Sequence, residues 1–400
     1  MPRTSSHHRS GWWLARRSEP AAKRHRLAIG VSLCAGATFV TLGAAGASAS
    51  TLTPAFLDGH ATTLYTESNQ VSGNAILAYR AGASALLTPI GSFPTGGTGT
   101  GSSPASQGGV TVGDGGLLLA AVNGGSNSVS VFGVAPSGQL QLLETAGSGG
   151  TDPISVTIHG RWVYALNAGN ATTPPNIGGF LLGSPLPHAT TFVRPLNGAA
   201  SSPEEISFSP DGRDLLVTEK ASNTIDVFPV NAFGEAGPAV TTTLAANTGP
   251  YGFQFTPQGI AVVSEASYGG LATFSLNPNG TLDQVSQVGD GQLAACWVAL
   301  SEDGQEAFTS NAHSGTISAY TVTPGGSLTL LPPAVQASPG IADTDLAVGP
   351  NSTLYVSDQP NFDASTINPA GGLSPSVIVA SGLPAGTFGL ATAGGPGIWH

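Results

Sequence analysis

A segment of about 47 residues recurs seven times along this chain, and this repeat constrains the fold more than any other feature. Each copy contains a short run of apolar and small residues that ends on an acidic residue or an asparagine. The seven end residues are Glu67, Asn123, Asn167, Glu219, Glu265, Asn311 and Asp358. Four strands of about five or six residues, with their turns, fill one such repeat, which is the size of a β-propeller blade.

Each repeat opens with two apolar residues separated by one other residue, and successive openings lie 42 to 50 residues apart. The pairs are Val110/Val112, Val156/Ile158, Ile206/Phe208, Phe253/Phe255, Val298/Leu300, Leu346/Val348 and Phe388/Leu390. Short β-rich runs alternate with Gly, Pro, Asn and Ser, and no long stretch keeps the apolar period of a helix. We therefore predict an all-β fold, a seven-bladed β-propeller built from four-stranded antiparallel blades.

The two ends of the repeat array predict how the ring closes. The first copy begins directly with the second type of strand at residues 61–65, and residues 388–392 are an opening strand with nothing after it. The C-terminal strand is therefore expected to complete blade one, which removes two exposed sheet edges. The propeller then spans residues 61–394, and residues 395–400 form a C-terminal tail. The seven polar residues that end the recurring runs are expected to form a ring around a central channel.

One stretch departs from the repeat. Residues 91–109 are rich in Gly, Ser, Thr and Pro. This composition predicts an extended, flexible loop between blades one and two.

The first 49 residues differ in kind from the rest of the chain. Several Arg and Lys residues precede an uncharged apolar run over residues 27–47, and Ala47-Ser48-Ala49 has the pattern of a cleavage site. We interpret residues 1–49 as an export signal cut after Ala49, and residues 50–60 as an N-terminal linker. The protein is then secreted, with no membrane segment after cleavage, whereas an uncut leader would be long enough to serve as an anchor.

Removal of this leader makes the remaining chain strongly acidic. Five of the 12 Lys and Arg residues and 22 of the 23 Asp and Glu residues follow residue 49, which gives a formal charge of −17. Such a surface repels nucleic acid and anionic lipid. Cys296 is the only cysteine after the leader, so no disulfide forms within the mature chain. We expect a monomer whose partner is a small molecule or an extracellular protein or glycan.

The fourth repeat carries a motif of known type. Residues 203–213 read Pro-Glu-Glu-Ile-Ser-Phe-Ser-Pro-Asp-Gly-Arg, and Gly249-Pro250 precedes Phe253 in the next repeat. Together with the repeat length, this pattern resembles the YVTN-type repeat of the lactonase-like seven-bladed propellers, which include 6-phosphogluconolactonase and carboxymuconate cyclase. The resemblance implies a lactone hydrolase whose site lies where loops lead into the first strands and follow the second strands.

The chain departs from this family at the positions that the resemblance makes catalytic. The family has Pro-His-x-His at the start of one blade, Gly-Pro-Arg-His at the start of the next, and a Glu at the end of that second blade's second strand. The corresponding residues here are Pro203-Glu204-Glu205, Gly249-Pro250-Tyr251-Gly252 and Glu265. The family's histidines and arginine are therefore lost, and with the arginine goes the bidentate clamp for a carboxylate or phosphate. Anionic lactones are not the expected substrates.

The glutamates of the polar ring are its best functional candidates, because a glutamate caps a turn less well than an asparagine does. We consider Glu265 as a general base, His313 as its partner and Glu219 as a further catalytic group. Carboxylates that share a channel raise one another's pKa or hold a cation, so Glu219 and Glu265 are also candidate ligands of Ca²⁺ or Mg²⁺. The simpler alternatives are local turns for the asparagines and a surface pair of Glu219 with Lys220.

The remaining ligand-binding candidates are expected on the same face. They are Glu67, Asn123, Asn167, Glu204, Tyr251, Trp297, Asn311 and Asp358. The aromatic faces of Tyr251 and Trp297 suit a sugar or another small neutral ligand, although Trp297 suits the core as well.

Two functions from different classes fit the sequence. The first is an exported lactonase-like propeller that binds a small neutral or cationic ligand in the central channel and hydrolyses an uncharged lactone, with no cofactor other than a divalent cation. The second is a noncatalytic extracellular module that binds a protein or surface glycan through its loops.

Overall fold

The computed structural model describes residues 62–82, 86–183, 192–196, 198, 201–336, 344–349, 352–369 and 371–394. The predicted export signal, the linker at 50–60 and the tail at 395–400 lie outside the described residues, so their boundaries stay predictions. Within the described ranges, no helix has the length and apolar character needed to cross a membrane.

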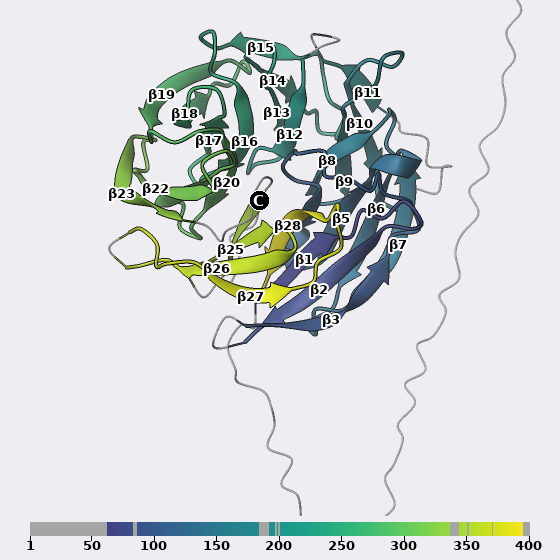
Figure 1. Cartoon of the computed structure of the whole chain (residues 1–400). Helices are drawn as coiled ribbons and strands as arrows, with labels where there is room; N and C mark the ends of the chain where they lie inside the picture. The colour runs from purple at the N-terminus through teal and green to yellow at the C-terminus, as the bar shows by residue number, and fades with distance from the viewer. Residues whose placement is uncertain are drawn as a thin grey trace, which may run out of the picture. The chain divides into compact units, whose positions relative to one another are not determined.

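Seven four-stranded antiparallel sheets surround a common axis, which confirms the predicted propeller (Figure 1). We number these blades in chain order, so that blade one contains β1 and blade seven contains β24. The innermost strands, from blade one to blade seven, are β28 (Phe388–Ala393), β4 (Val110–Gly113), β8 (Pro153–His159), β12 (Pro203–Phe208), β16 (Pro250–Phe255), β20 (Ala295–Leu300) and β24 (Thr344–Gly349). Each contains the predicted pair of apolar residues.

The other three strands of each blade lie successively further from the axis. The second strands are β1 (Thr63–Glu67), β5 (Leu118–Asn123), β9 (Trp162–Asn167), β13 (Asp214–Glu219), β17 (Ile260–Glu265), β21 (Glu306–Asn311) and β25 (Thr353–Asp358). The third strands are β2 (Ala75–Ala81), β6 (Ser128–Val134), β10 (Asn176–Leu181), β14 (Thr224–Pro229), β18 (Gly270–Leu276), β22 (Thr316–Val322) and β26 (Asn361–Thr366). The outer strands are β3 (Leu87–Pro94), β7 (Leu140–Gly147), β11 (Phe192–Pro195), β15 (Val240–Thr243), β19 (Leu282–Gly289), β23 (Leu328–Gln336) and β27 (Val377–Ser381).

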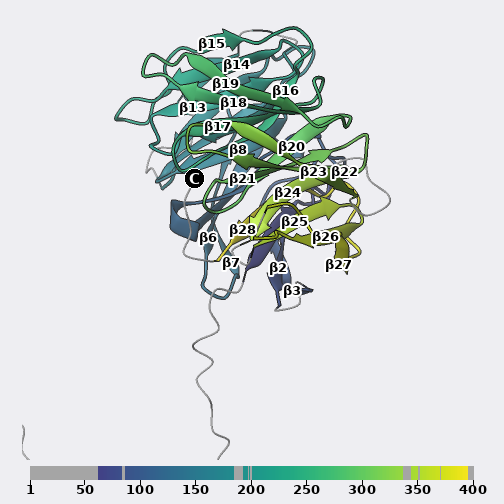
Figure 2. The ribbon, with the colours of Figure 1, turned by 90° about the vertical axis from the view of Figure 1, so that its left-hand side faces the viewer.

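The C-terminal strand closes the ring, as predicted. β28 pairs antiparallel with β1, with Tyr65 opposite Ala391, and the Thr66 hydroxyl donates a hydrogen bond to the Phe388 carbonyl at 3.1 Å. Figure 2 shows β28 beside β24, the innermost strand of the preceding blade. Blade one is thus assembled from both ends of the repeat array. The pairing of β1 with β28 covers the edge that each of these strands would otherwise expose to the other side.

The apolar residues of each blade pack against the next blade rather than toward the axis. Among the described residues, seven buried clusters are each centred on two neighbouring sheets. In one of them Leu216 and Val227 of blade four meet Phe253 and Val263 of blade five, and all four are fully buried. Burial of such side chains contributes about 1.5–3 kcal/mol each, so the interfaces between blades hold the ring together.

Two faces of the propeller need names. The turn face is formed by the turns from innermost to second strands, such as residues 209–213 and 301–305. The loop face is the opposite one, where loops such as residues 201–202 and 290–294 lead into the innermost strands and where the second strands end. In the first of these turns the Ser209 hydroxyl donates to Asp211 at 2.7 Å and Gly212 adopts a φ of 69°, which a glycine tolerates best.

Candidate functional site

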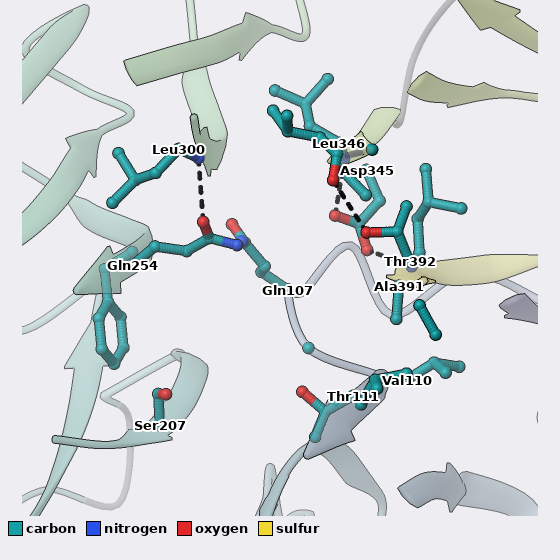
Figure 3. A pocket seen from close by; sticks show the side chains of 18 of the residues that line it. Gln107, Val110, Thr111, Ser207, Gln254, Leu300, Asp345, Leu346, Ala391 and Thr392 are labelled. Atoms are coloured by element: carbon teal, nitrogen blue, oxygen red, sulfur yellow. Dashed lines mark hydrogen bonds between the residues drawn. The ribbon is translucent and has the colours of Figure 1, made fainter. Parts of the chain in front are cut away.

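A cavity of about 220 Å³ lies on the propeller axis between the innermost strands (Figure 3). Its volume corresponds to about seven water molecules at roughly 30 Å³ each, so it suits a small ligand. The polar residues of its wall include Gln107, Thr111, Glu205, Ser207, Gln254, Ser301, Glu302, Asp345 and Thr392. Among the described residues that line it, none is Lys, Arg or His. The wall therefore offers acceptors and neutral donors but no cation for an anionic ligand.

The axial position of these polar side chains follows from the open edges of the innermost strands. Such an edge carries backbone N–H groups without a strand partner, and each needs an acceptor. Side chains of one innermost strand supply acceptors to the next. The bonds are Ile206 N to Ser155 at 3.2 Å, Phe208 N to Thr157 at 3.2 Å, Phe253 N to Glu205 at 2.6 Å, Leu300 N to Gln254 at 3.0 Å and Leu390 N to Asp345 at 2.8 Å.

Two of these acceptors are carboxyl groups, Glu205 and Asp345, and both are buried, at 6% exposure each. Asp345 accepts backbone N–H groups on both oxygens, from Leu346 and Leu390 at 2.8 Å. Glu205 accepts Phe253 N on Oε2, and its Oε1 has no hydrogen-bond partner among the described residues. Both groups thus have a structural role, and Glu205 keeps one oxygen that can face a ligand.

Burial makes these two carboxyl groups weak acids. It raises the pKa of Asp345 to about 7, although the two backbone N–H groups partly offset this. It raises the pKa of Glu205 well above its ordinary value; the Phe253 N–H works against this rise and the charge of Asp345 adds to it. Both carboxyl groups therefore keep their protons to a higher pH than an exposed carboxyl group does.

The end of the channel near the loop face is closed by residues 106–109. The Ser106 hydroxyl donates to Ile154 O in blade three at 2.8 Å, and Gln107 N donates to Glu204 O in blade four at 3.2 Å. The Gln107 amide pairs with the edge of blade six, because Nε2 donates to Val298 O at 2.7 Å and Val298 N donates to Oε1 at 2.8 Å. Gln107 is only 4% exposed. We call this segment the plug.

The predicted loop between blades one and two is present over residues 95–109, but residues 91–94 belong to β3 and the plug is not a free, flexible segment. The plug is fixed by hydrogen bonds to blades on opposite sides of the ring. Trp297 adds a bond from its indole N–H to Ser106 O at 2.9 Å. Gly-rich composition indicated mobility, but the glycines let the backbone pass close to its neighbours: a Cβ on Gly109 would lie 2.2 Å from the Phe388 ring.

Gly252 leaves the space that the Gln107 amide fills. A Cβ at this position would lie 2.0 Å from Gln107 Oε1 and 2.8 Å from Cys296 O. The family resemblance places a histidine here, so the departure of this chain from the family has a structural counterpart. A side chain at residue 252 and the plug cannot both be accommodated in this position.

The seven ring residues occupy equivalent positions, since each is the last residue of a second strand, as predicted. None of them lines the cavity. The innermost strand lies between each second strand and the axis, so their side chains are buried inside the blades. Their partners are mostly on the third strand or next to it: Asn74, directly before the third strand, for Glu67, Ser130 for Asn123, Asn176 for Asn167, Gln287 of the outer strand for Glu265, and Ser318 for Asn311.

Two ring residues face another acid instead. Glu219 lies near Asp226 inside blade four; burial raises the pKa of Glu219 to about 8, an effect that Ser201 opposes and the charge of Asp226 reinforces. Burial and the neighbouring charge of Asp363 raise the pKa of Asp358 to about 7 in blade seven. These pairs hold protons at neutral pH rather than presenting charge to a channel.

Glu204, Tyr251 and Trp297 do come together, in a group on the loop-face side of the plug. Lys220 lies 2.7 Å from the Glu204 carboxyl and 4.8 Å from the centroid of the Tyr251 ring, and Tyr251 meets Trp297 edge to face at 5.4 Å. Lys220 thus pairs with Glu204 and not with Glu219, the surface pair considered from the sequence. Tyr251 and Trp297 are 2% exposed, so they are core residues here. Burial raises the pKa of Glu204 to about 7, against the opposing effect of Lys220.

The structure does not join Glu265 to His313. Glu265 is fully buried and accepts a bond from Gln287 at 2.5 Å, whereas His313 is an exposed residue of a blade-six loop. Among the described residues, no group of three or more His, Cys, Asp or Glu side chains is arranged to hold a metal ion. The Ca²⁺ or Mg²⁺ site at Glu219 and Glu265 stays a prediction.

Sequence reasoning selected Glu204 and missed Glu205, Asp345 and Gln107. The signal for the first two was present, since both lie at the start of an innermost strand next to an apolar pair. A bulge decides which of the neighbouring glutamates reaches the axis: the register of β12 shifts between Pro203 and Glu205. Gln107 lies outside every repeat, and no local pattern marked it.

Comparison with solved structures supports the fold. A Bacteroides fragilis protein provisionally described as a 6-phosphogluconolactonase has a TM-score of 0.66 at 21% identity, over 85% of this chain and 99% of the other. The periplasmic gluconolactonase of Pseudomonas aeruginosa has a TM-score of 0.67 at 17% identity, over 82% and 99% of the two chains. No family model and no curated protein sequence matches the chain.

A further neighbour limits what the fold implies. A streptogramin B lyase has a TM-score of 0.52 at 12% identity, over 75% of this chain and 91% of the other. The same architecture thus carries a different reaction class. The chain has the lactonase-like seven-bladed propeller fold, and its chemistry must be argued from its own residues.

Proposed function

We propose that this protein binds a small neutral or cationic ligand in the axial cavity and hydrolyses an uncharged lactone there. The observation that carries this proposal is the presence of two buried carboxyl groups, Glu205 and Asp345, in a cavity whose described wall holds no basic residue. A phosphorylated or carboxylated lactone would meet only acidic and neutral groups. The lactonases among the neighbouring structures support the reaction class and not the substrate.

In this proposal the two carboxyl groups divide the roles of general acid and general base. Asp345 ionises near pH 7 and acts as the base that takes a proton from water, whose oxygen attacks the lactone carbonyl. Glu205 remains protonated; its Oε2 accepts the Phe253 N–H, and its Oε1 donates the proton to the ring oxygen as the ring C–O bond breaks. The product is a hydroxy acid, and its negative charge favours release from an acidic cavity.

The test compares hydrolysis of glucono-δ-lactone with that of its 6-phosphate in a pH-stat. We expect turnover of the uncharged lactone only, with a rate that rises through about pH 7 as Asp345 ionises. Asp345→Asn and Glu205→Gln should each lower the rate by about 10²–10⁴-fold, the usual contribution of a general acid or base. Asp211→Asn, in an exposed turn, is the matched control. Wild-type rates in both cavity variants would exclude this mechanism.

The second candidate function is the noncatalytic interaction module. Exposed apolar side chains on loops of the loop face favour it, namely Val71 at 64%, Tyr268 at 45% and Leu293 at 64% exposure. A module of this kind requires that Glu205→Gln and Asp345→Asn leave partner binding unchanged, while Tyr268→Ser and Leu293→Ser weaken it. Secretion with cleavage after Ala49 is part of both proposals, and N-terminal sequencing of the exported protein would test it.

A further inference from the structure

The positions of the plug and of the cavity indicate the face of the propeller through which a ligand reaches the cavity. Gln107 and Gly108 form one end of the cavity wall. At the other end the wall reaches Ser301, Glu302 and Gly394, of which Glu302 and Gly394 are exposed. Ser301 and Glu302 belong to a turn of the turn face.

The closed end is built to stay closed. The Gln107 amide occupies both hydrogen-bonding groups of Val298, as a neighbouring strand would. Its removal would leave a buried backbone N–H and a buried carbonyl unpaired, which is unfavourable. Further bonds tie the plug to blade three, through Ser106 to Ile154 and through Val156 N to Gly108 O at 2.8 Å.

We infer that ligands enter and leave the axial cavity through the turn face, and that Gln107 is the specificity-determining residue at its blind end, where it limits the length of the ligand. The positions that the family resemblance makes catalytic, Glu204, Tyr251 and Glu265, do not line this cavity. The working face is thus opposite to the one that the resemblance implies. The nature of the ligand rests on the proposed function, but the route does not.

The route can be measured without a substrate. Ser207 lies on the cavity wall, and Ser207→Cys places a thiol there with little change in volume (Figure 3). The full chain carrying this change is treated with methyl methanethiosulfonate, a small neutral thiol reagent. Peptide mass spectrometry then gives the labelling rate at residue 207 separately from that at Cys296, which is buried.

Two bulky substitutions distinguish the faces. Glu302→Trp, at the mouth, should slow labelling at residue 207 by about tenfold or more because access governs thiol reactivity. Ser102→Trp is the matched control, since Ser102 is exposed and precedes the plug on the opposite side. It should leave the rate within about twofold. Gln107→Ala added to Glu302→Trp should restore labelling through the newly opened end, and it should admit longer ligands.

The inference is overturned if Ser102→Trp slows labelling at residue 207 and Glu302→Trp does not, or if neither substitution slows it. If Gln107→Ala does not fold, as shown by its circular dichroism melt, the two tryptophan variants still decide the route. The labelling pattern and the hydrolysis assay are independent. The expected labelling without lactone turnover would refute the proposed function alone, and turnover without the labelling pattern would refute the route alone.

Discussion

Replacement of Gly252 by alanine tests how firmly the plug is seated. The new methyl group would lie 2.0 Å from Gln107 Oε1, so the amide must move. Movement breaks its two bonds to Val298, worth about 0.5–1.5 kcal/mol each. The contact with Cys296 O at 2.8 Å adds strain that a backbone atom cannot easily relieve, about 1 kcal/mol. We expect a loss of about 2–4 kcal/mol in the free energy of unfolding, a large part of the usual 5–15 kcal/mol.

The assay is urea unfolding followed by circular dichroism, with Gly147→Ala as the control. A Cβ on Gly147 meets nothing within 4 Å and its φ is not in the left-handed region, so this change should be nearly neutral. In a Gln107→Ala background, Gly252→Ala should cost only the Cys296 contact, which gives a coupling of about 1–3 kcal/mol between the two sites. Equal costs for the two glycine substitutions, or no coupling, would refute the account of the plug.

Two further predictions concern the ring as a whole. Truncation before Phe388 removes β28 and should lower the free energy of unfolding by more than about 5 kcal/mol, because apolar burial and hydrogen bonds are lost. Truncation after Gly394 is the control. If the chain that lacks β28 melts like the control, ring closure by this strand is contradicted. The raised pKa of Glu219 means that its contribution to stability is full below about pH 4.5 and is lost as pH rises to about 8, at most about 5 kcal/mol. Glu219→Gln should make the free energy of unfolding, measured with urea, less dependent on pH across this range. If its pH dependence equals that of the wild type, the acid pair with Asp226 is not protonated.

The sequence predicted the blades well because their signals are local. An apolar pair and a terminal polar residue recur in each copy, and the second strands end at Glu67, Asn123 and their five counterparts as expected. Closure by β28 followed from counting strand types at the two ends of the array. Both inferences need only periodicity and order along the chain.

The site was harder to predict because it depends on side-chain direction across the whole ring. A shift of one residue turns a side chain to the other face of its strand, and the bulge in β12 makes this shift between Pro203 and Glu205. The ring residues were placed correctly along their strands, yet the innermost strand separates them from the axis. The plug depends on contacts between residues 191 positions apart, Gln107 and Val298, which no repeat pattern encodes.

The pairing of β1 with β28 also has a consequence for the chain while it is being made. β1 is among the first strands to leave the ribosome, but the partner of Thr66 follows 322 residues later. During that delay one side of β1 offers unpaired backbone groups to any extended peptide nearby. Loop closure over such a distance is slow, so newly synthesised copies at high density are at risk of exchanging their last strands with one another.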